Sequence, residues 1–358
     1  MKEIKIPRHI MQKYLEKIEN KPIKIKTYKR LGSGWHGTGY SIVYIVGKKE
    51  KKVILRTIRP EGFSHDYKAD RAKVFILQHE LSKKIPLHIK SLDVGGYTKH
   101  GSLVSLGNCE EFFQIVEVAE GREYFDYINE IKERGKLSKE DRKKALLLSN
   151  YLVNLHKNKF RGKKEIADSL YRRHLRDCVG GGEMLMGVLD TYPERLKWTN
   201  IKEITEIITR AVELREEIKH MSYRLCRIHG DFHPGNILFY KDKFTVLDAS
   251  REEFGDPTDD LTALSINYLW YALQQNNRFS GIFIELFNLF WNNYLRKTND
   301  KAISHIAPIF FAFRGVVVAH PLFYPNQSNE TRKKIFKFIK NILKDKEFNI
   351  NKLNDYLK

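Results

Sequence analysis

Cysteine is scarce in this chain, and its three cysteines lie far apart. Cys109, Cys178 and Cys226 form no CxxC pair and show no Cys/His spacing of the kind that binds zinc. The sequence therefore argues against a disulfide framework and against a structural zinc fold. We therefore expect the protein in a reducing cellular compartment.

The chain also lacks a long uninterrupted apolar run. Residues 1–12 interleave Lys, Glu and Pro with single apolar residues, unlike a secretory signal. The most apolar stretch, residues 306–323, contains Arg314 and His320 and is broken by Pro308 and Pro321. We expect a buried helix there rather than a membrane span, and hence a soluble, cytoplasmic protein with no membrane partner.

Acidic residues are in the minority, since 64 Lys and Arg stand against 44 Asp and Glu and give a net charge of +20. A positive field attracts anions such as nucleotides or RNA. The basic residues are spread along the 358-residue chain rather than gathered in blocks, which favours a dispersed, solvated charge. Nucleic acid is therefore a partner that the composition permits but does not favour.

The most informative segment is residues 228–239, with the sequence IHGDFHPGNILF. Asp231 and Asn236 stand five residues apart in a short loop before an apolar strand, and Asp248 ends a second short strand. Phosphoryl transfer needs one carboxylate to accept the hydroxyl proton, and an amide oxygen and a second carboxylate to hold Mg²⁺ on the nucleotide phosphates. A polar turn between two strands is the alternative. Because residue types, spacing and flanking strands all agree, we predict a kinase.

This motif resembles the kinase catalytic loop in the His-Gly-Asp form of the aminoglycoside phosphotransferase and choline kinase-like family. The resemblance covers roughly residues 28–264. It implies an ATP- and Mg²⁺-dependent phosphotransferase that phosphorylates a hydroxyl of a small molecule. It also implies that Asp231 is the catalytic base, and that Asn236 and Asp248 are Mg²⁺ ligands.

Other residues around the motif have expected supporting roles. We expect His229 to support the loop by hydrogen bonding, whereas His233 either contacts metal or phosphate or braces the loop. Asp256 and Asp260 resemble structural carboxylates that cap and tie the following helix. Where the family usually has an aromatic residue and an acid, residues 249–251 read Ala-Ser-Arg. This departure concerns the acceptor side of the site.

A glycine-rich segment precedes the motif by about two hundred residues. Gly32, Gly34 and Gly37 fit the pattern GxGxxG between strands predicted over residues 23–26, 41–46 and 53–58, the last two joined by a hairpin. Because no helix follows directly, the pattern argues against a dinucleotide-binding turn and for a flap over nucleotide phosphates. A plain hairpin turn is the alternative.

The resemblance also places a basic residue on the third strand, paired with an acid on the next helix. That position is Arg56, where Lys is commoner, and an Arg there resembles the choline and ethanolamine kinase branch. A guanidinium can still hold phosphate through two hydrogen bonds. The helix is predicted over residues 66–83, with Asp70 as the paired acid and Glu80 as the alternative, although either can be a solvated charge.

The predicted fold is α+β, a two-lobed protein-kinase-like fold. Residues 1–119 are expected to form a small nucleotide-binding lobe of about five antiparallel strands, two of them near 89–94 and 103–106, with one helix. An apolar run over residues 112–121 resembles the strand before the adenine-binding hinge, which implies adenine contacts by Glu117, Val118 and Ala119. Residues 120–358 are expected to form a larger, mainly helical lobe with the catalytic loop and the substrate site.

The acceptor is left open by the sequence. An amino alcohol, a sugar or nucleoside, an aminoglycoside and a protein Ser/Thr are all candidates, with residues 161–219 as a candidate substrate wall. A cationic acceptor would need a locally acidic pocket, for which the candidates are Asp177, Glu183, Asp190, Glu252 and Glu253. The rival hypothesis is a catalytically weak or silent kinase fold that binds RNA or a protein, which the basic charge and Arg56 favour and the complete motif opposes.

Overall fold

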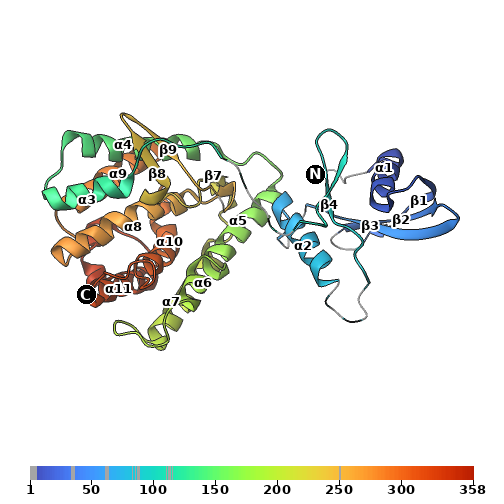
Figure 1. Cartoon of the computed structure of the whole chain (residues 1–358). Coiled ribbons are helices and arrows are strands. Elements are labelled where there is room, and N and C mark those ends of the chain that lie inside the picture. Colours follow the sequence, from blue (N-terminus) through green and yellow to red (C-terminus); the bar gives the residue numbers. More distant parts are fainter. Residues whose placement is uncertain are drawn as a thin grey trace. The chain divides into compact units, whose positions relative to one another are not determined.

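The computed structural model describes residues 6–33, 37–60, 64–82, 84, 86, 89–109, 111, 114, 116–249 and 251–358. The chain forms two compact units, Met1–Val116 and Glu117–Lys358 (Figure 1). The sequence predicted a division after Ala119, three residues beyond this boundary. The functions expected of the two lobes stay predictions.

The N-terminal unit is built on an antiparallel sheet. Three strands pair in chain order, namely β1 (Ile23–Ser33), β2 (Gly37–Val46) and β3 (Lys49–Ile58). Every second residue of β2 is buried, so Ile42 and Tyr44 share one face of the sheet. Helix α1 (Arg8–Glu19) packs Met11 and Leu15 into the same core. The strands predicted over residues 23–26, 41–46 and 53–58 are thus confirmed, although each is longer than predicted.

The rest of this unit differs in part from the prediction. Helix α2 (Lys68–Leu81) confirms the helix expected over 66–83, but α1 was not predicted, so the unit has at least two helices. The strands β4 (Gly95–Tyr97) and β5 (Leu103–Ser105) form a separate two-stranded sheet, and the strand expected over residues 89–94 is wrong. Asp93 explains the error: its carboxylate accepts hydrogen bonds from the N–H of Val94 and the hydroxyl of Ser105, both at 2.9 Å, and such local bonds compete with strand pairing.

The C-terminal unit is mainly helical. Its helices are α3 (Tyr124–Arg134), α4 (Lys139–His156), α5 (Lys164–Gly180), α6 (Leu185–Asp190), α7 (Ile201–Ile218), α8 (Pro257–Asn276), α9 (Ile282–Thr298), α10 (Ile303–Val318) and α11 (Asn329–Asp345). Its strands are β6 (Arg122–Glu123), β7 (Cys226–Arg227), β8 (Ile237–Tyr240), β9 (Lys243–Val246) and β10 (Phe254–Gly255), paired as β6-β8-β9 and β10-β7. The predicted α+β class, with a small antiparallel unit and a larger helical one, is confirmed.

Two helices form the centre of the C-terminal unit. Helices α8 and α10 pack on each other, and α8 is buried continuously from Pro257 to Leu273 (Figure 1). Helix α10 carries the apolar run with Arg314 inside it and is buried on almost every side, as predicted. Among the residues described, no helix combines the length and apolarity needed to cross a membrane.

Candidate active site

The candidate catalytic loop connects β7 to β8 in the C-terminal unit. Gly230 has φ +82°, a left-handed conformation that suits glycine, and lets the chain turn just before Asp231. His233 caps the short 3₁₀ helix Pro234–Asn236, because its Nδ1 accepts a backbone N–H at 3.1 Å. His229 Nδ1 accepts the N–H of Asp231 at 3.3 Å. The bracing role expected of His229 is confirmed, and His233 makes the bracing contact of its two alternatives.

Asp260, in the first turn of α8, holds this loop in place. Its carboxylate accepts the N–H groups of His229 and Gly230, each at 2.8 Å, and Nε2 of His156 lies 3.1 Å away. Burial raises the pKa of Asp260, but the hydrogen bond and charge of His156 outweigh it and the pKa lies below its usual range. Asp256 is the N-cap of α8. The structural roles predicted for both carboxylates are confirmed.

Asp231 contacts α10 through a buried arginine. Arg314 Nη1 donates to Asp231 Oδ1 at 2.6 Å, while its Nη2 donates to Asp259 Oδ1 at 2.7 Å and to the Gly230 carbonyl at 2.9 Å. Arg251 Nη2 lies 3.6 Å from Asp231 Oδ2. Burial raises the pKa of Asp231, but the two guanidinium charges lower it by more than burial raises it. The pKa therefore lies below its ordinary value. The carboxylate is therefore ionised at neutral pH, as a proton acceptor must be.

The hairpin of β8 and β9 brings the two predicted metal ligands close together. The N–H of Leu247 donates to the Asn236 carbonyl at 2.9 Å, so Asp248 follows next to the end of the loop. Asn236 Nδ2 donates to the Asp231 carbonyl at 3.0 Å, and its Oδ1 has no hydrogen-bond donor within the described part of the chain. Asp248 is exposed and has φ +56°. An amide oxygen and an accessible carboxylate suit Mg²⁺, which prefers oxygen ligands and completes its shell with water and substrate phosphates.

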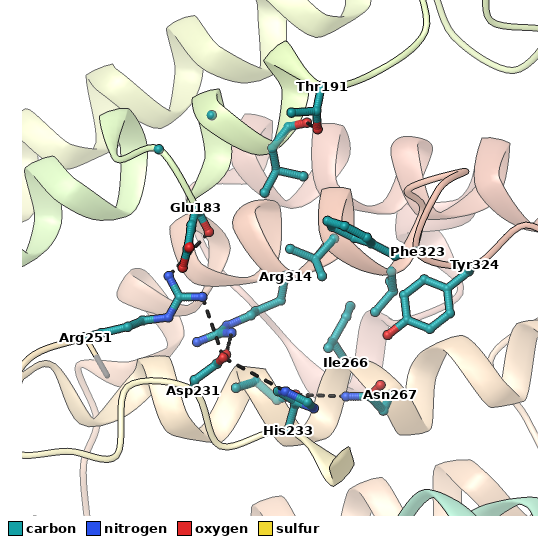
Figure 2. Close-up of a pocket in the computed structure, with 16 residues that line it drawn as sticks. Glu183, Thr191, Asp231, His233, Arg251, Ile266, Asn267, Arg314, Phe323 and Tyr324 are labelled. Atoms are coloured by element: carbon teal, nitrogen blue, oxygen red, sulfur yellow. Dashed lines mark hydrogen bonds and ion pairs between the residues drawn. The ribbon is translucent and has the colours of Figure 1, made fainter. Parts of the chain in front are cut away.

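A cavity of about 380 Å³ opens beside Asp231, entirely within the C-terminal unit (Figure 2). Its polar side is formed by Glu183, Asp231, His233, Arg251 and Arg314. The other lining residues are Gly182, Gly187, Val188, Thr191, Ala263, Ile266, Asn267, Val317, Val318, Phe323 and Tyr324. Residues of the 161–219 segment thus form one wall of the cavity, where a substrate wall was predicted.

The glycine-rich segment lies where β1 turns into β2. Gly32 is near the end of β1 and Gly37 begins β2, while Gly34 falls outside the described residues. A Cβ at Gly37 would lie 2.1 Å from the carbonyl oxygen of Thr57 on β3, so strand packing alone already requires glycine there. Phosphate binding by these three glycines stays a prediction.

The basic residue and its candidate acids lie on β3 and α2. Arg56 is exposed and pairs in register with Gly39. Asp70 Oδ2 accepts the N–H of Tyr67 at 2.7 Å in a capping box at the start of α2, and Glu80 is exposed near the end of that helix. Asp70 therefore has a structural function as a helix cap, and the pairing of either acid with Arg56 stays a prediction.

The predicted hinge residues follow directly after the boundary between the units. Glu117, Val118 and Ala119 form no strand, and the side chain of Val118 is 93% exposed. Adenine binding here stays a prediction.

Only one of the five acids proposed for a cation-binding pocket lines the cavity, namely Glu183. Asp177 pairs with Arg173 and Arg176, Glu252 lies 3.6 Å from His174, Glu253 pairs with Arg227 at 2.7 Å, and Asp190 is exposed at the end of α6. Arg251 and Arg314, which the sequence did not place in the site, are the charged groups next to Asp231.

Residues 187–288 match the model of the phosphotransferase enzyme family. The matched region includes the candidate catalytic loop, Asp248 and α8. No curated protein matches the chain.

Several solved structures are similar over most of the chain. They include amicoumacin kinase hAmiN in complex with AMP-PNP, Ca²⁺ and Ami, at 15% identity over 96% of each chain with a TM-score of 0.42. A thermostable mutant of aminoglycoside phosphotransferase APH(4)-Ia in its apo form has 15% identity over 93% of this chain and 98% of that chain, with a TM-score of 0.34. Choline kinase from Cryptosporidium parvum Iowa II has 12% identity over 98% of this chain and 92% of that chain, with a TM-score of 0.30. These similarities are too low to support an argument about function. The family match over residues 187–288 confirms the resemblance to phosphotransferases that the His-Gly-Asp motif indicated.

Proposed function

We propose that this protein transfers the γ-phosphoryl group of Mg²⁺-bound ATP to a hydroxyl of a small molecule, with Asp231 as the catalytic base. The position of Asp231 carries the proposal. Its carboxylate lines the cavity, while its own carbonyl accepts the amide N–H of Asn236. Base and candidate metal ligand are thereby fixed to each other, as phosphoryl transfer between two positioned reactants requires.

Asp231 would orient the acceptor hydroxyl and accept its proton as the new O–P bond forms. Arg314 holds one carboxylate oxygen at 2.6 Å, so the side chain does not have to become ordered when the acceptor binds. The second oxygen has only longer contacts to Arg251 and His233, at 3.6 and 3.9 Å. That oxygen is the one available to the hydroxyl.

Asn236 and Asp248 would hold Mg²⁺, and the N-terminal unit would supply the nucleotide contacts of the glycine-rich segment, Arg56 and the hinge. When bound, the ion neutralises the charge of the β- and γ-phosphates. The accessible oxygens of the two ligands, and their neighbouring positions at the open end of the β8–β9 hairpin, support this assignment.

The size of the cavity supports a small-molecule acceptor. A volume of about 380 Å³ lies within the range of small-molecule sites, and residues from α6, α8 and α10 line it on several sides. A protein Ser/Thr acceptor would instead require an open groove for an extended peptide.

The test measures ATP turnover and nucleotide binding by the full chain, with and without EDTA. Asp231→Asn should abolish transfer and leave Mg·ATP affinity nearly unchanged, because the base acts on the acceptor. Asp248→Ala should weaken Mg·ATP binding itself, because it removes a metal ligand. Asp242→Asn is the matched control, since Asp242 is an exposed carboxylate in the β8–β9 turn, paired with Lys143. Full activity of Asp231→Asn would refute the assignment.

The same measurements address the rival, a silent kinase fold that binds RNA. The net charge of +20 is the observation in its favour. The rival predicts no Mg²⁺-dependent ATP binding or turnover, together with tight RNA binding whose affinity falls steeply with salt.

A further inference from the structure

The cavity beside Asp231 has two chemically different sides. Figure 2 shows Arg251 and Arg314 directed at Asp231, and farther across the cavity Ile266, Asn267, Phe323 and Tyr324. Phe323 remains 56% exposed even though it lines the cavity. An acceptor that fills this space therefore has an apolar body as well as the hydroxyl that reaches Asp231.

The two arginines differ in how far their charges are neutralised. Arg314 has two carboxylates at hydrogen-bond distance, Asp231 at 2.6 Å and Asp259 at 2.7 Å. Arg251 has none, because the nearest carboxylate oxygen in the described part of the chain is that of Asp231 at 3.6 Å. The side chain of Arg251 is nevertheless only 16% exposed. A guanidinium this far from water is normally paired.

The hydrogen bonds of Arg251 are also incomplete. Both of its bonds come from Nη1, to the Glu183 carbonyl at 3.3 Å and to Met184 Sδ at 2.9 Å. Neither Nε nor Nη2 has an acceptor within hydrogen-bond distance among the described residues, and Nε is buried. Unused donors on a buried cation are costly, and an anionic group of a ligand would satisfy Nη2, which unlike Nε is not enclosed by protein.

Cation recognition has little support in the same cavity. Of the acids near it, Asp177, Glu252 and Glu253 have basic neighbours elsewhere, and the two that line the cavity are Glu183 and Asp231. Glu183 is exposed, and its own carbonyl is bonded to Arg251. Asp231 is bonded to Arg314, so the charged group beside it that keeps an unused donor towards the cavity is Arg251.

We propose that the acceptor is an anionic alcohol with an apolar body, and that Arg251 binds its carboxylate or other anionic group next to the hydroxyl held by Asp231. The proposal rests on the proposed function in that it identifies the ligand of this cavity as the phosphoryl acceptor. The short distance between Arg251 and Asp231 requires the anion and the hydroxyl to lie only a few bonds apart, as in a 2-hydroxy acid. Arg251 is then the residue that selects the acceptor by charge.

The test compares three compounds that share a phenyl ring and a hydroxyl and differ in charge. These are 3-phenyllactate, the neutral 3-phenylpropane-1,2-diol and the cationic phenylalaninol, titrated calorimetrically into the full chain with AMP-PNP and Mg²⁺. A charge-assisted hydrogen bond corresponds to about ten- to hundredfold in affinity, so phenyllactate should bind about that much more tightly than the diol, and phenylalaninol most weakly.

Variants of Arg251 test whether the charge of this arginine causes the preference for phenyllactate. Arg251→Gln should reduce the advantage of phenyllactate over the diol to less than about threefold, and Arg251→Lys should retain part of it. Arg227→Gln is the control, because Arg227 is an exposed arginine paired with Glu253, and it should leave the preference unchanged. Circular dichroism and thermal unfolding check that each variant is folded.

Several results would overturn the proposal. These are tighter binding of phenylalaninol, no binding or no preference among the three compounds, or a preference that survives Arg251→Gln. Weakened AMP-PNP binding in Arg251→Gln, with the preference for phenyllactate intact, would instead show that Arg251 binds the transferred phosphoryl group. If the proposed function is wrong, the wild-type chain will instead show no Mg²⁺-dependent ATP binding or turnover.

Discussion

Replacing Arg314 with methionine should destabilise the C-terminal unit strongly. Arg314 is 4% exposed and bridges Asp231, Asp259 and the Gly230 carbonyl. The substitution leaves Asp259, which is 1% exposed, as a buried carboxylate without its cation. Removing one partner of a buried pair typically costs about 3–5 kcal/mol. Asp231 contributes less to this cost, because its side chain is 16% exposed and water in the cavity can reach it.

The measurement is urea unfolding of the full chain followed by tryptophan fluorescence. Three of the four tryptophans, Trp198, Trp270 and Trp291, lie in the C-terminal unit, so the signal reports mainly that unit. Arg122→Met is the matched control, because Arg122 also has two acidic neighbours in the same unit but is half exposed. Water screens such a pair, so the control should unfold close to the wild-type midpoint.

A second substitution tests whether the lost stability comes from the unpaired carboxylate of Asp259. In the Arg314→Met background, Asp259→Asn should recover part of the lost stability, because a neutral amide is less costly to bury than an unpaired carboxylate. In the wild-type background the same change should be destabilising, because it weakens an existing pair. A loss below about 1 kcal/mol for Arg314→Met, the range of surface pairs, would refute the reasoning. So would further destabilisation when Asp259→Asn is added.

Three further outcomes are expected. Stability of the C-terminal unit should fall as pH rises from 6.5 to about 9. Burial lowers the pKa of His174, but Glu252 outweighs burial and raises this pKa to about 9. The stabilising charge of His174 is therefore complete below pH 6.5 and is lost as the pH rises through 9. Denaturant curves at several pH values measure this, and His174→Gln should flatten them. Gly230→Ala should cost about 1–2 kcal/mol and slow turnover, because φ +82° is unfavourable for a residue with a Cβ; Gly96→Ala, with nothing near its Cβ, is the control. EDTA should abolish ATP turnover without unfolding the chain, because hydrogen bonds to Asp260 hold the catalytic loop, and a shifted urea midpoint would contradict this.

Local sequence patterns predicted the regular elements well where packing agreed with them. The β-branched residues of the run 41–46 predicted β2, and one face of that strand does pack against a core. Helix α2, expected over residues 66–83, covers Lys68–Leu81 and so lies within two residues of each predicted end. The pattern failed over residues 89–94, where Asp93 makes hydrogen bonds to Tyr14, Val94 and Ser105 that no periodicity reveals.

The contiguous part of the candidate site followed from the sequence for a physical reason. Asp231 and Asn236 are linked through one backbone carbonyl, and Asp248 is brought next to them by the β8–β9 hairpin. Both relations arise within 18 residues, so residue type and spacing are enough to suggest them. The candidate nucleotide residues of the other unit depend on contacts across the chain, and no local pattern tests those.

The surroundings of Asp231 depend on residues that are distant in sequence, and the apolar run in α10 indicated one of them. An arginine inside a helix that is otherwise apolar must find an acceptor, because its burial is too costly without one. Asp231, 83 residues earlier, and Asp259, 55 residues earlier, are those acceptors, one in the catalytic loop and one in the first turn of α8. The sequence thus revealed that Arg314 needs a partner but not which carboxylate it meets, since that follows only from the packing of α8 against α10. The same holds for Arg251, which lies in residues 249–251, where the sequence departs from the family pattern on the acceptor side. Only the positions of Asp231 and Glu183 show that its charge faces the cavity.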